Sequence, residues 1–242
     1  MDLKIKDVAE LLNVSETTIR RWLADGKIPA YRMNHQYRFS RIEIENWILN
    51  CKLKSSANSP FQEKQIYPAE TEGKEEASSR KGMQHFCLYR AVHQGDVLHD
   101  VPGATKEDVI RETTKRIAQS LNVDAEVLSE LLLDREKLMP TALNNEIAVP
   151  HTRDFLRKGP LDMVFLVYPN QPLDYGALDG KPVHTLFFLF ASNDKGHLQL
   201  LAKLAHLSSN PSSLEFLRSK PDKKLLLDFI KNWEGEVHSL ST

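Results

Sequence analysis

The sequence predicts two domains, a small, mostly helical one at the N-terminus and a larger α/β one at the C-terminus. The chain of 242 residues exceeds one typical domain, and its 41% apolar residues suffice for two cores. Between residues 55 and 82 the composition shifts to Ser, Glu, Lys, Pro and Gly without an apolar period. Helical spacing dominates before this stretch, whereas short runs rich in Val and Phe, typical of buried strands, occur after it.

Charge and cysteine content exclude several classes of protein. The formal net charge is −1, and Cys51 and Cys87 have neither metal-binding nor redox spacing, so we expect a reduced, cytoplasmic compartment. Nine histidines form no ligand pattern, so no metal or other cofactor is implied. The N-terminus has no apolar signal region, and the apolar run Leu186–Ala191 is far below the roughly 18 residues of a membrane span. We therefore expect no membrane insertion.

The first domain, residues 1–54, opens with two short helices. Apolar residues at Ile5, Val8, Ala9 and Leu12 have helical spacing, and Asn13-Val14 breaks the pattern. Ser15 is suited to cap a second helix that turns three apolar residues inward: Ile19, Trp22 and Leu23. This is the spacing of a helix-turn-helix.

The rest of this domain predicts a wing. The chain turns at Asp25-Gly26 and runs as two extended pieces around Met33–Gln36. It then closes with a helix that carries Ile42, Ile44, Trp47 and Ile48. Through the motifs KIKDVAELLNVSETTIRRW, GKIPAYR and YRF, residues 1–52 resemble the winged helix-turn-helix domains of the excisionase and MerR type.

This resemblance implies contact with duplex DNA through the second helix and the wing. The implied contacts are Ser15, Thr17, Thr18, Arg20 and Arg21 on the recognition helix, and Arg32, His35, Tyr37 and Arg38 on the wing. Residues 1–54 hold ten Lys and Arg against seven Asp and Glu, a weak balance for a DNA binder. The acids, however, are mostly on the first and last helices, at Asp7, Glu10, Glu43 and Glu45. Taken singly, each arginine could equally be a solvated surface charge.

Residues 55–82 are predicted to be a flexible linker. A flexible chain of about 28 residues has an r.m.s. span of about 25–30 Å, which lets the flanking domains move independently.

The second domain, residues 83–242, has an α/β pattern. Lys106–Leu121 is periodic as a helix, and Val127, Leu128, Leu131 and Leu132 mark a second, shorter one. Met163–Tyr168 and Val183–Ala191 are expected to be buried strands. A further helix is expected to begin at His197.

The stretch Asp134–Arg153 carries the strongest chemical signal. Pro150 lacks an N–H, so a strand over Glu146–Val149 should stop there and leave His151 at its exposed end. Neutral imidazole is a nucleophile near pH 7, and Arg135 and Arg153 could offer donors to a phosphoryl dianion on it. A histidine after proline is by itself most often only a loop residue.

A longer match gives this histidine its meaning. In order, the segments are TKEDVI, DREKL, PT, IAVPH, DGKPV at Asp179–Val183 and HLQLLAKLAHL from His197. With them, residues 105–242 resemble the type 2 enzyme IIA domains of the bacterial phosphoenolpyruvate-dependent phosphotransferase system, the mannitol, fructose and nitrogen-regulatory branch. The resemblance implies an α/β fold, a mixed sheet with flanking helices. Thr152 and Asn144-Asn145 depart from the family, which often has glycine at or near these positions.

Carried over by motif, the resemblance places the phosphorylated histidine at His151, a second active-site histidine at His197 and the active-site arginine at Arg135. It implies phospho-HPr as the phosphoryl donor and a IIB domain as the usual acceptor. His197 would donate a hydrogen bond to the phosphoryl oxygens. His184 and His206 are interpreted as structural.

Two functions follow, neither of them a free-standing metabolic enzyme. In the first, a transcriptional regulator reads phosphotransferase status at His151 and passes it to the DNA-binding domain. In the second, a phosphocarrier serves a sugar permease IIB, and the N-terminal domain is a protein-contact module. The chain contains no IIB-like phosphocysteine loop and no IIC portion, which favours the first. We expect a homo-oligomer, and we expect the His151 dianion to act on the arginine-bearing face of residues 15–38.

Overall fold

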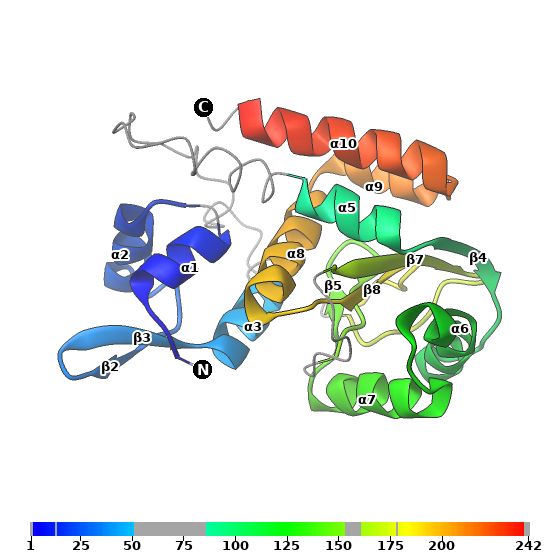
Figure 1. Cartoon of the computed structure of the whole chain (residues 1–242), viewed down its shortest axis with the longest axis horizontal. Helices are drawn as coiled ribbons and strands as arrows, with labels where there is room; N and C mark the ends of the chain where they lie inside the picture. The colour runs from blue at the N-terminus through cyan, green and yellow to red at the C-terminus, as the bar shows by residue number, and fades with distance from the viewer. Residues whose placement is uncertain (1, 13, 51–85, 153–160, 178, 240–242) are drawn as a thin grey trace.

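The computed structural model describes residues 2–12, 14–50, 86–152, 161–177 and 179–239, which form two packed units (Figure 1). The predicted linker over 55–82 and the predicted phosphate contact Arg153 lie outside these residues. Among the described helices, none combines the length and the apolar character that a membrane crossing requires.

The N-terminal unit combines three helices with a small antiparallel sheet in the order β1-β3-β2. Its elements are β1 (Asp2–Leu3), α1 (Ile5–Leu12), α2 (Glu16–Ala24), β2 (Tyr31–Met33), β3 (Gln36–Ser40) and α3 (Arg41–Asn50). The helix-turn-helix and the wing are as predicted, whereas the pairing of β1 with β3 was not predicted.

Local chemistry explains these elements. Ser15 caps α2 by accepting a hydrogen bond from the Thr18 N–H at 3.1 Å, a contact worth about 1 kcal/mol. Asn34 and His35 both have positive φ, as a two-residue hairpin turn requires. The core contains Trp22, whose ring centroid lies 5.7 Å from that of Trp47. Phe39 of β3 is fully buried in the same cluster, which holds the wing to the helical core.

The C-terminal unit is an α/β domain. Its elements are α5 (Cys87–Gln94), β4 (Val97–Val101), α6 (Lys106–Leu121), α7 (Ala125–Leu138), β5 (Ala142–Leu143), β6 (Ile147–Ala148), β7 (Met163–Pro169), β8 (Thr185–Phe190), α8 (Asp194–Leu207), α9 (Pro211–Arg218) and α10 (Lys223–Ser239).

The five strands form a mixed sheet in the order β4-β7-β8-β6-β5. The β4–β7 and β6–β8 pairs are parallel, and the β7–β8 and β5–β6 pairs are antiparallel. Side chains alternate across β7, so that Val164 and Leu166 pack on one side while Phe165 and Val167 pack on the other. Helices α5, α9 and α10 lie over one face, and α6 and α7 lie under the other (Figure 1). Both faces are therefore covered, which explains why β7 and β8 are apolar throughout.

The sequence located most of these elements. The helix over Lys106–Leu121 and the mixed sheet with flanking helices are confirmed, and α7 is longer than the short helix predicted there. Helix α8 begins at Asp194 rather than at His197, because Asn193 caps it by accepting the Gly196 N–H at 2.9 Å. Elements α5, β4, β5, α9 and α10 were not predicted.

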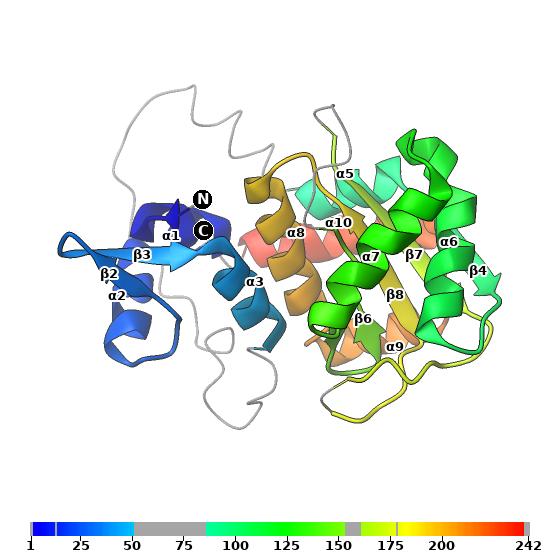
Figure 2. The same ribbon diagram turned by 90° about the horizontal axis from the view of Figure 1, so that it is seen from below.

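The two units meet along α8. Helices α1 and α3 both contact α8 (Figure 2), and α3 also contacts β5. One continuous apolar cluster runs from Ile44 and Ile48 of α3 to Leu198 and Leu201 of α8. Two charged pairs flank it: Arg41 with Asp194 at 2.6 Å, and Lys195 with Glu10 at 3.1 Å. The first residues of α8 are therefore part of the contact between the units.

Candidate functional site

His151 follows β6 and is held against β8. Strand β6 ends at Ala148, as the missing N–H of Pro150 predicted. The Pro150 carbonyl then accepts the Leu189 N–H at 2.9 Å, and His151 forms a parallel bridge with Leu189. Nδ1 of His151 lies 2.7 Å from the Val149 carbonyl oxygen. Because a carbonyl only accepts, Nδ1 carries a ring proton, and Nε2 is the nitrogen that faces the rest of the site.

Arg135 directs its guanidinium at this nitrogen. Its Nε lies 3.1 Å from Nε2 of His151, and its Nη1 donates to the Met139 carbonyl at 3.0 Å. The neighbouring Glu136 accepts the N–H and the hydroxyl of Thr141, at 3.1 and 2.6 Å, which fixes the loop after α7. The adjacent DREKL and PT motifs thus hold the arginine and its loop in one arrangement.

His197, in the first turn of α8, completes the group that the sequence predicted. Its ring centroid lies 5.0 Å from that of His151, at an interplanar angle of 62°. Burial lowers the pKa of His197 to about 4, an effect that the charge of His151 adds to and the Glu45 carboxylate opposes. At neutral pH this ring is therefore uncharged and can donate one hydrogen bond.

A fourth side chain, Glu45 of α3, enters this group from the N-terminal unit. Its Oε1 accepts from Nη2 of Arg135 at 2.8 Å and lies 3.0 Å from Nε2 of His151. Its Oε2 is 3.5 Å from Nε2 of His197. All four side chains are buried, with at most 3% exposed. From the sequence, Glu45 was expected only as one of the acids of the last helix, and this position was not predicted.

The environment keeps Glu45 ionised. Burial raises the pKa of its carboxyl, but the hydrogen-bonding and charge interactions of the carboxylate with His151 and His197 outweigh that effect and hold the pKa far below its ordinary value. An isolated buried carboxylate would be costly, so the donors around Glu45 are what make its burial tolerable.

His151 was expected at an exposed strand end, and this expectation is wrong. The residue is 0% exposed, because α3 places Glu45 against its Nε2. Thr152, the departure from family glycine, is also buried. A donor molecule cannot reach Nε2 while α3 holds this position.

Three of these residues could also be considered as metal ligands. Among the described residues, Glu45, His151 and His197 bring one ligand atom each within 4.8 Å of one another. The sequence predicted no metal, because the three positions have no ligand spacing. Arg135 already places its guanidinium 2.8 Å from Glu45 Oε1 and 3.1 Å from His151 Nε2, and this positive charge would repel a dication. Arg135, His151 and His197 therefore suit an anion, such as the Glu45 carboxylate, better than a metal ion.

The remaining family motifs brace this site rather than enter it. The turn before β6 has positive φ at Asn145 and Glu146, which explains why glycine is common there in the family. Asp179 of the DGKPV turn accepts the Asn145 N–H at 2.8 Å, and the Asn145 amide donates to the Ser208 carbonyl at 3.0 Å. His184 lies 3.1 Å from Glu146, outside the site, as its structural interpretation implied.

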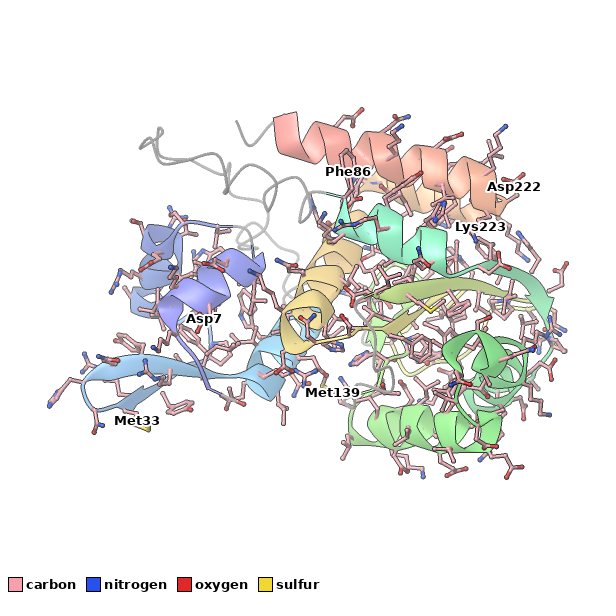
Figure 3. All side chains as sticks on the ribbon, viewed as in Figure 1. Asp7, Met33, Phe86, Met139, Asp222 and Lys223 are labelled. Carbon is pink, nitrogen blue, oxygen red and sulfur yellow. The ribbon has the colours of Figure 1, made fainter. Side chains whose placement is uncertain are left out.

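The predicted DNA contacts lie on the other side of the N-terminal unit, away from α8 (Figures 1 and 2). Thr17, Arg20 and Arg21 are exposed on α2, whereas the hydroxyls of Ser15 and Thr18 lie 2.9 Å apart at the cap. The wing carries exposed Arg32 and His35 and the partly buried Tyr37 and Arg38, with Arg32 5.1 Å above the Tyr37 ring. Figure 3 shows Met33 at the end of the wing farthest from the C-terminal unit.

Comparison with known proteins agrees with this division. Residues 91–233 match the family model "Phosphoenolpyruvate-dependent sugar phosphotransferase system, EIIA 2", and residues 3–52 match a helix-turn-helix domain model. A nitrogen regulatory protein of Pseudomonas aeruginosa is 34% identical over 59% of this chain and 94% of its own length. The crystal structure of nitrogen regulatory protein IIA-Ntr from Neisseria meningitidis has a TM-score of 0.54 at 26% identity, covering 59% of this chain and 98% of that one. A transcriptional repressor, DcmR of Methylorubrum extorquens, is 42% identical over 25% of this chain and 22% of its own length.

The fold and the His151, His197 and Arg135 arrangement define a phosphotransferase IIA-type domain joined to a winged helix-turn-helix. The chain belongs to the type 2 EIIA family of the phosphoenolpyruvate-dependent sugar phosphotransferase system.

Proposed function

We propose that this chain is a transcriptional regulator that accepts a phosphoryl group from phospho-HPr on Nε2 of His151 and thereby alters its binding to DNA. The observation that carries the proposal is the 2.7 Å contact between Nδ1 of His151 and the Val149 carbonyl. It keeps a proton on Nδ1, so that Nε2, which faces Arg135, is the nucleophile once the Glu45 carboxylate no longer contacts it. The proposed setting is the cytoplasm, where the two cysteines stay reduced.

The transfer needs no proton movement and no cofactor. The Nε2 lone pair of His151 attacks phosphorus, the P–N bond of the donor histidine breaks, and its electron pair stays on the donor nitrogen. Arg135 offers planar N–H groups to the phosphoryl oxygens, and neutral His197 offers one more donor. Both groups stabilise charge where it develops, which is the main contribution a protein makes to phosphoryl transfer.

The N-terminal unit supplies the output. It matches a helix-turn-helix model, and exposed arginines occur on both its second helix and its wing. Such a unit binds duplex DNA by placing the second helix in the major groove. Specific affinity is expected to require a homo-oligomer, since one small basic unit makes few contacts with phosphates.

Labelling with phosphoenolpyruvate, enzyme I and HPr tests the acceptor. The wild-type chain should take up one acid-labile, base-stable phosphate, and His151→Ala should abolish it. His206→Ala is the matched control, because His206 is exposed on α8 outside the site, and this variant should label as wild type does. Equal labelling of the wild-type chain and of His151→Ala would disprove the assignment.

The alternative function, a phosphocarrier for a permease IIB domain, does not require DNA binding, whereas a transcriptional regulator does. The full chain should retard fragments of its own promoter in a gel at low salt. Failure to bind any such fragment, together with transfer of phosphate to a IIB domain, would favour the phosphocarrier.

A further inference from the structure

The face that docks onto the C-terminal unit carries one buried acid among apolar residues. On α3, Ile44, Ile48 and Leu49 are buried and pack into the shared cluster, and Glu45 is buried between them with 1% exposed. The three side chains described as approaching the Glu45 carboxylate all belong to the other unit: Arg135, His151 and His197. Glu45 therefore gains its partners only when the two units are docked.

The position of Glu45 is that of an anion bound to the acceptor site. Its carboxylate, like a phosphoryl group, presents oxygen acceptors to the Arg135 guanidinium and to both imidazole rings. Oε1 accepts from Nη2 and Nε of Arg135 at 2.8 and 3.1 Å. The same oxygen lies 3.0 Å from Nε2 of His151. The groups that would bind a phosphoryl dianion are thus already used by a side chain of the same protein.

A phosphoryl group and Glu45 cannot share this position. A P–N bond would bring phosphorus closer to Nε2 than the 3.0 Å that now separates Nε2 from Oε1. The two anions would also repel each other in a buried site, where water screens charge poorly. Phosphorylation of His151 therefore requires α3 to leave.

We propose that the winged helix-turn-helix unit is an internal lid on the phosphoacceptor site, closed by the Glu45 carboxylate in the place of the phosphoryl group. This rests on His151 being the phosphoacceptor, as proposed above. Docking and phosphorylation exclude each other, and linkage makes the effect reciprocal: docking slows phosphorylation, and phosphorylation releases the unit. The remaining interface, with its Arg41–Asp194 pair and apolar cluster, aligns α3 for this contact.

The test uses full-length wild-type chain, Glu45→Gln and Glu45→Ala, with Glu43→Gln as control. Glu43 is on the same helix but exposed, so it tests for a general effect of removing an acid from α3. Two readouts are taken from each variant. One is the reaction of the His151 and His197 peptides with diethyl pyrocarbonate in the unphosphorylated protein, measured by mass spectrometry. The other is the initial rate of labelling by phospho-HPr.

Both Glu45 variants should react with the reagent and accept phosphate at least about 10-fold faster than the wild-type chain, within the usual range of coupling between two sites. Glu43→Gln should behave as wild type. Protection and labelling rates that stay unchanged in Glu45→Ala would overturn the lid. If no variant accepts phosphate but Glu45→Ala loses protection, the proposed function fails and the closed site is supported. If no variant accepts phosphate and Glu45→Ala stays protected from the reagent, both the proposed function and the lid are disproved.

A second variant opens the contact without touching the acceptor group. Arg41→Glu places a negative charge opposite Asp194, which now pairs with Arg41 at 2.6 Å. It should increase reagent access and labelling as the Glu45 variants do, and adding Asp194→Lys should restore protection. If Arg41→Glu stays closed, or if the restored pair does not close again, docking does not depend on this face.

Discussion

The two faces of the N-terminal unit differ in what they carry and in what covers them. The outer face, α2 and the wing, presents exposed arginines and is not covered by the C-terminal unit (Figure 1). The inner face, α1 and α3, is apolar with acids at Glu10 and Glu45, and it packs on α8. One small domain therefore has a cationic side suited to DNA and an opposite side whose buried acid, Glu45, meets the proposed phosphoacceptor.

This comparison corrects how the two domains were expected to communicate. The sequence suggested that a dianion on His151 would act on the arginine-bearing face of residues 15–38. In the structure the side chain that meets His151 is an acid, Glu45, and the arginines belong to α2 and the wing, elements that lie away from α8 (Figure 2). We therefore infer that phosphorylation undocks the inner face from α8. The C-terminal unit is then no longer fixed beside the proposed DNA-binding surface. The outer face needs no uncovering.

The largest expected effect separates the two faces. Replacing Arg20 and Arg21 together by Ala should lower the affinity of the full chain for its promoter by at least about 100-fold. The slope of log affinity against log salt should fall by about 2, because each lost phosphate contact contributes about 0.9. Gel shifts at several salt concentrations measure both quantities.

The labelling rate of His151 is the control for this variant. It should stay at the wild-type value, since both arginines are exposed on α2, away from the docked face. A changed labelling rate would show that the outer face contributes to the closed site, and the division between the faces would fail.

The elements that could be predicted from the sequence are those formed by interactions between residues close together along the chain. Helix α6 was located to the residue because its period, the Thr105 capping box and the αL cap at Asn122 are all local. Buried strands β7 and β8 were located because apolar runs of that length are short and rich in Val and Phe. Arg135, His151 and His197 came from family motifs, and the structure brings them together.

Glu45 could not be found in this way. It lies 106 residues from His151 along the chain, and the contact joins two domains whose docking no local pattern encodes. The available signal was weak: an acid flanked by apolar residues at helical spacing, next to Glu43, which is an ordinary exposed acid on the same helix. Helices α5, α9 and α10 were also not predicted, since none of them carries one of the family motifs.

The second-largest effect is expected from acidification, which should lower the stability of the folded chain by protonating His197. The pKa of His197 is about 4 when folded, against an ordinary 6.5, so burial favours its neutral form. Its contribution to stability is therefore fully present above pH 6.5 and is lost as the pH falls toward 4. Between pH 7 and pH 5 this one group should cost about 2 kcal/mol, at 1.36 kcal/mol for each pH unit.

Urea unfolding of the wild-type chain and of His197→Gln at both pH values measures this term. The glutamine variant should lose about 2 kcal/mol less than wild type over the interval, because it has no ring to protonate. Parallel pH profiles for the two proteins would mean that His197 is not held neutral in the folded chain.

The smallest effect is expected at the edge of the inner face. Lys195 and Glu10 form a pair between the units at 3.1 Å, but their side chains are 44% and 49% exposed. Water and salt screen such a pair, and its net worth is less than about 1 kcal/mol. Lys195→Ala should therefore raise the labelling rate of His151 by no more than about fivefold, well below the effect of Glu45→Ala. An equal effect of the two variants would mean that the exposed charged pairs, and not Glu45, stabilise the docked state. The burial of Glu45 would then be a consequence of docking and not its cause.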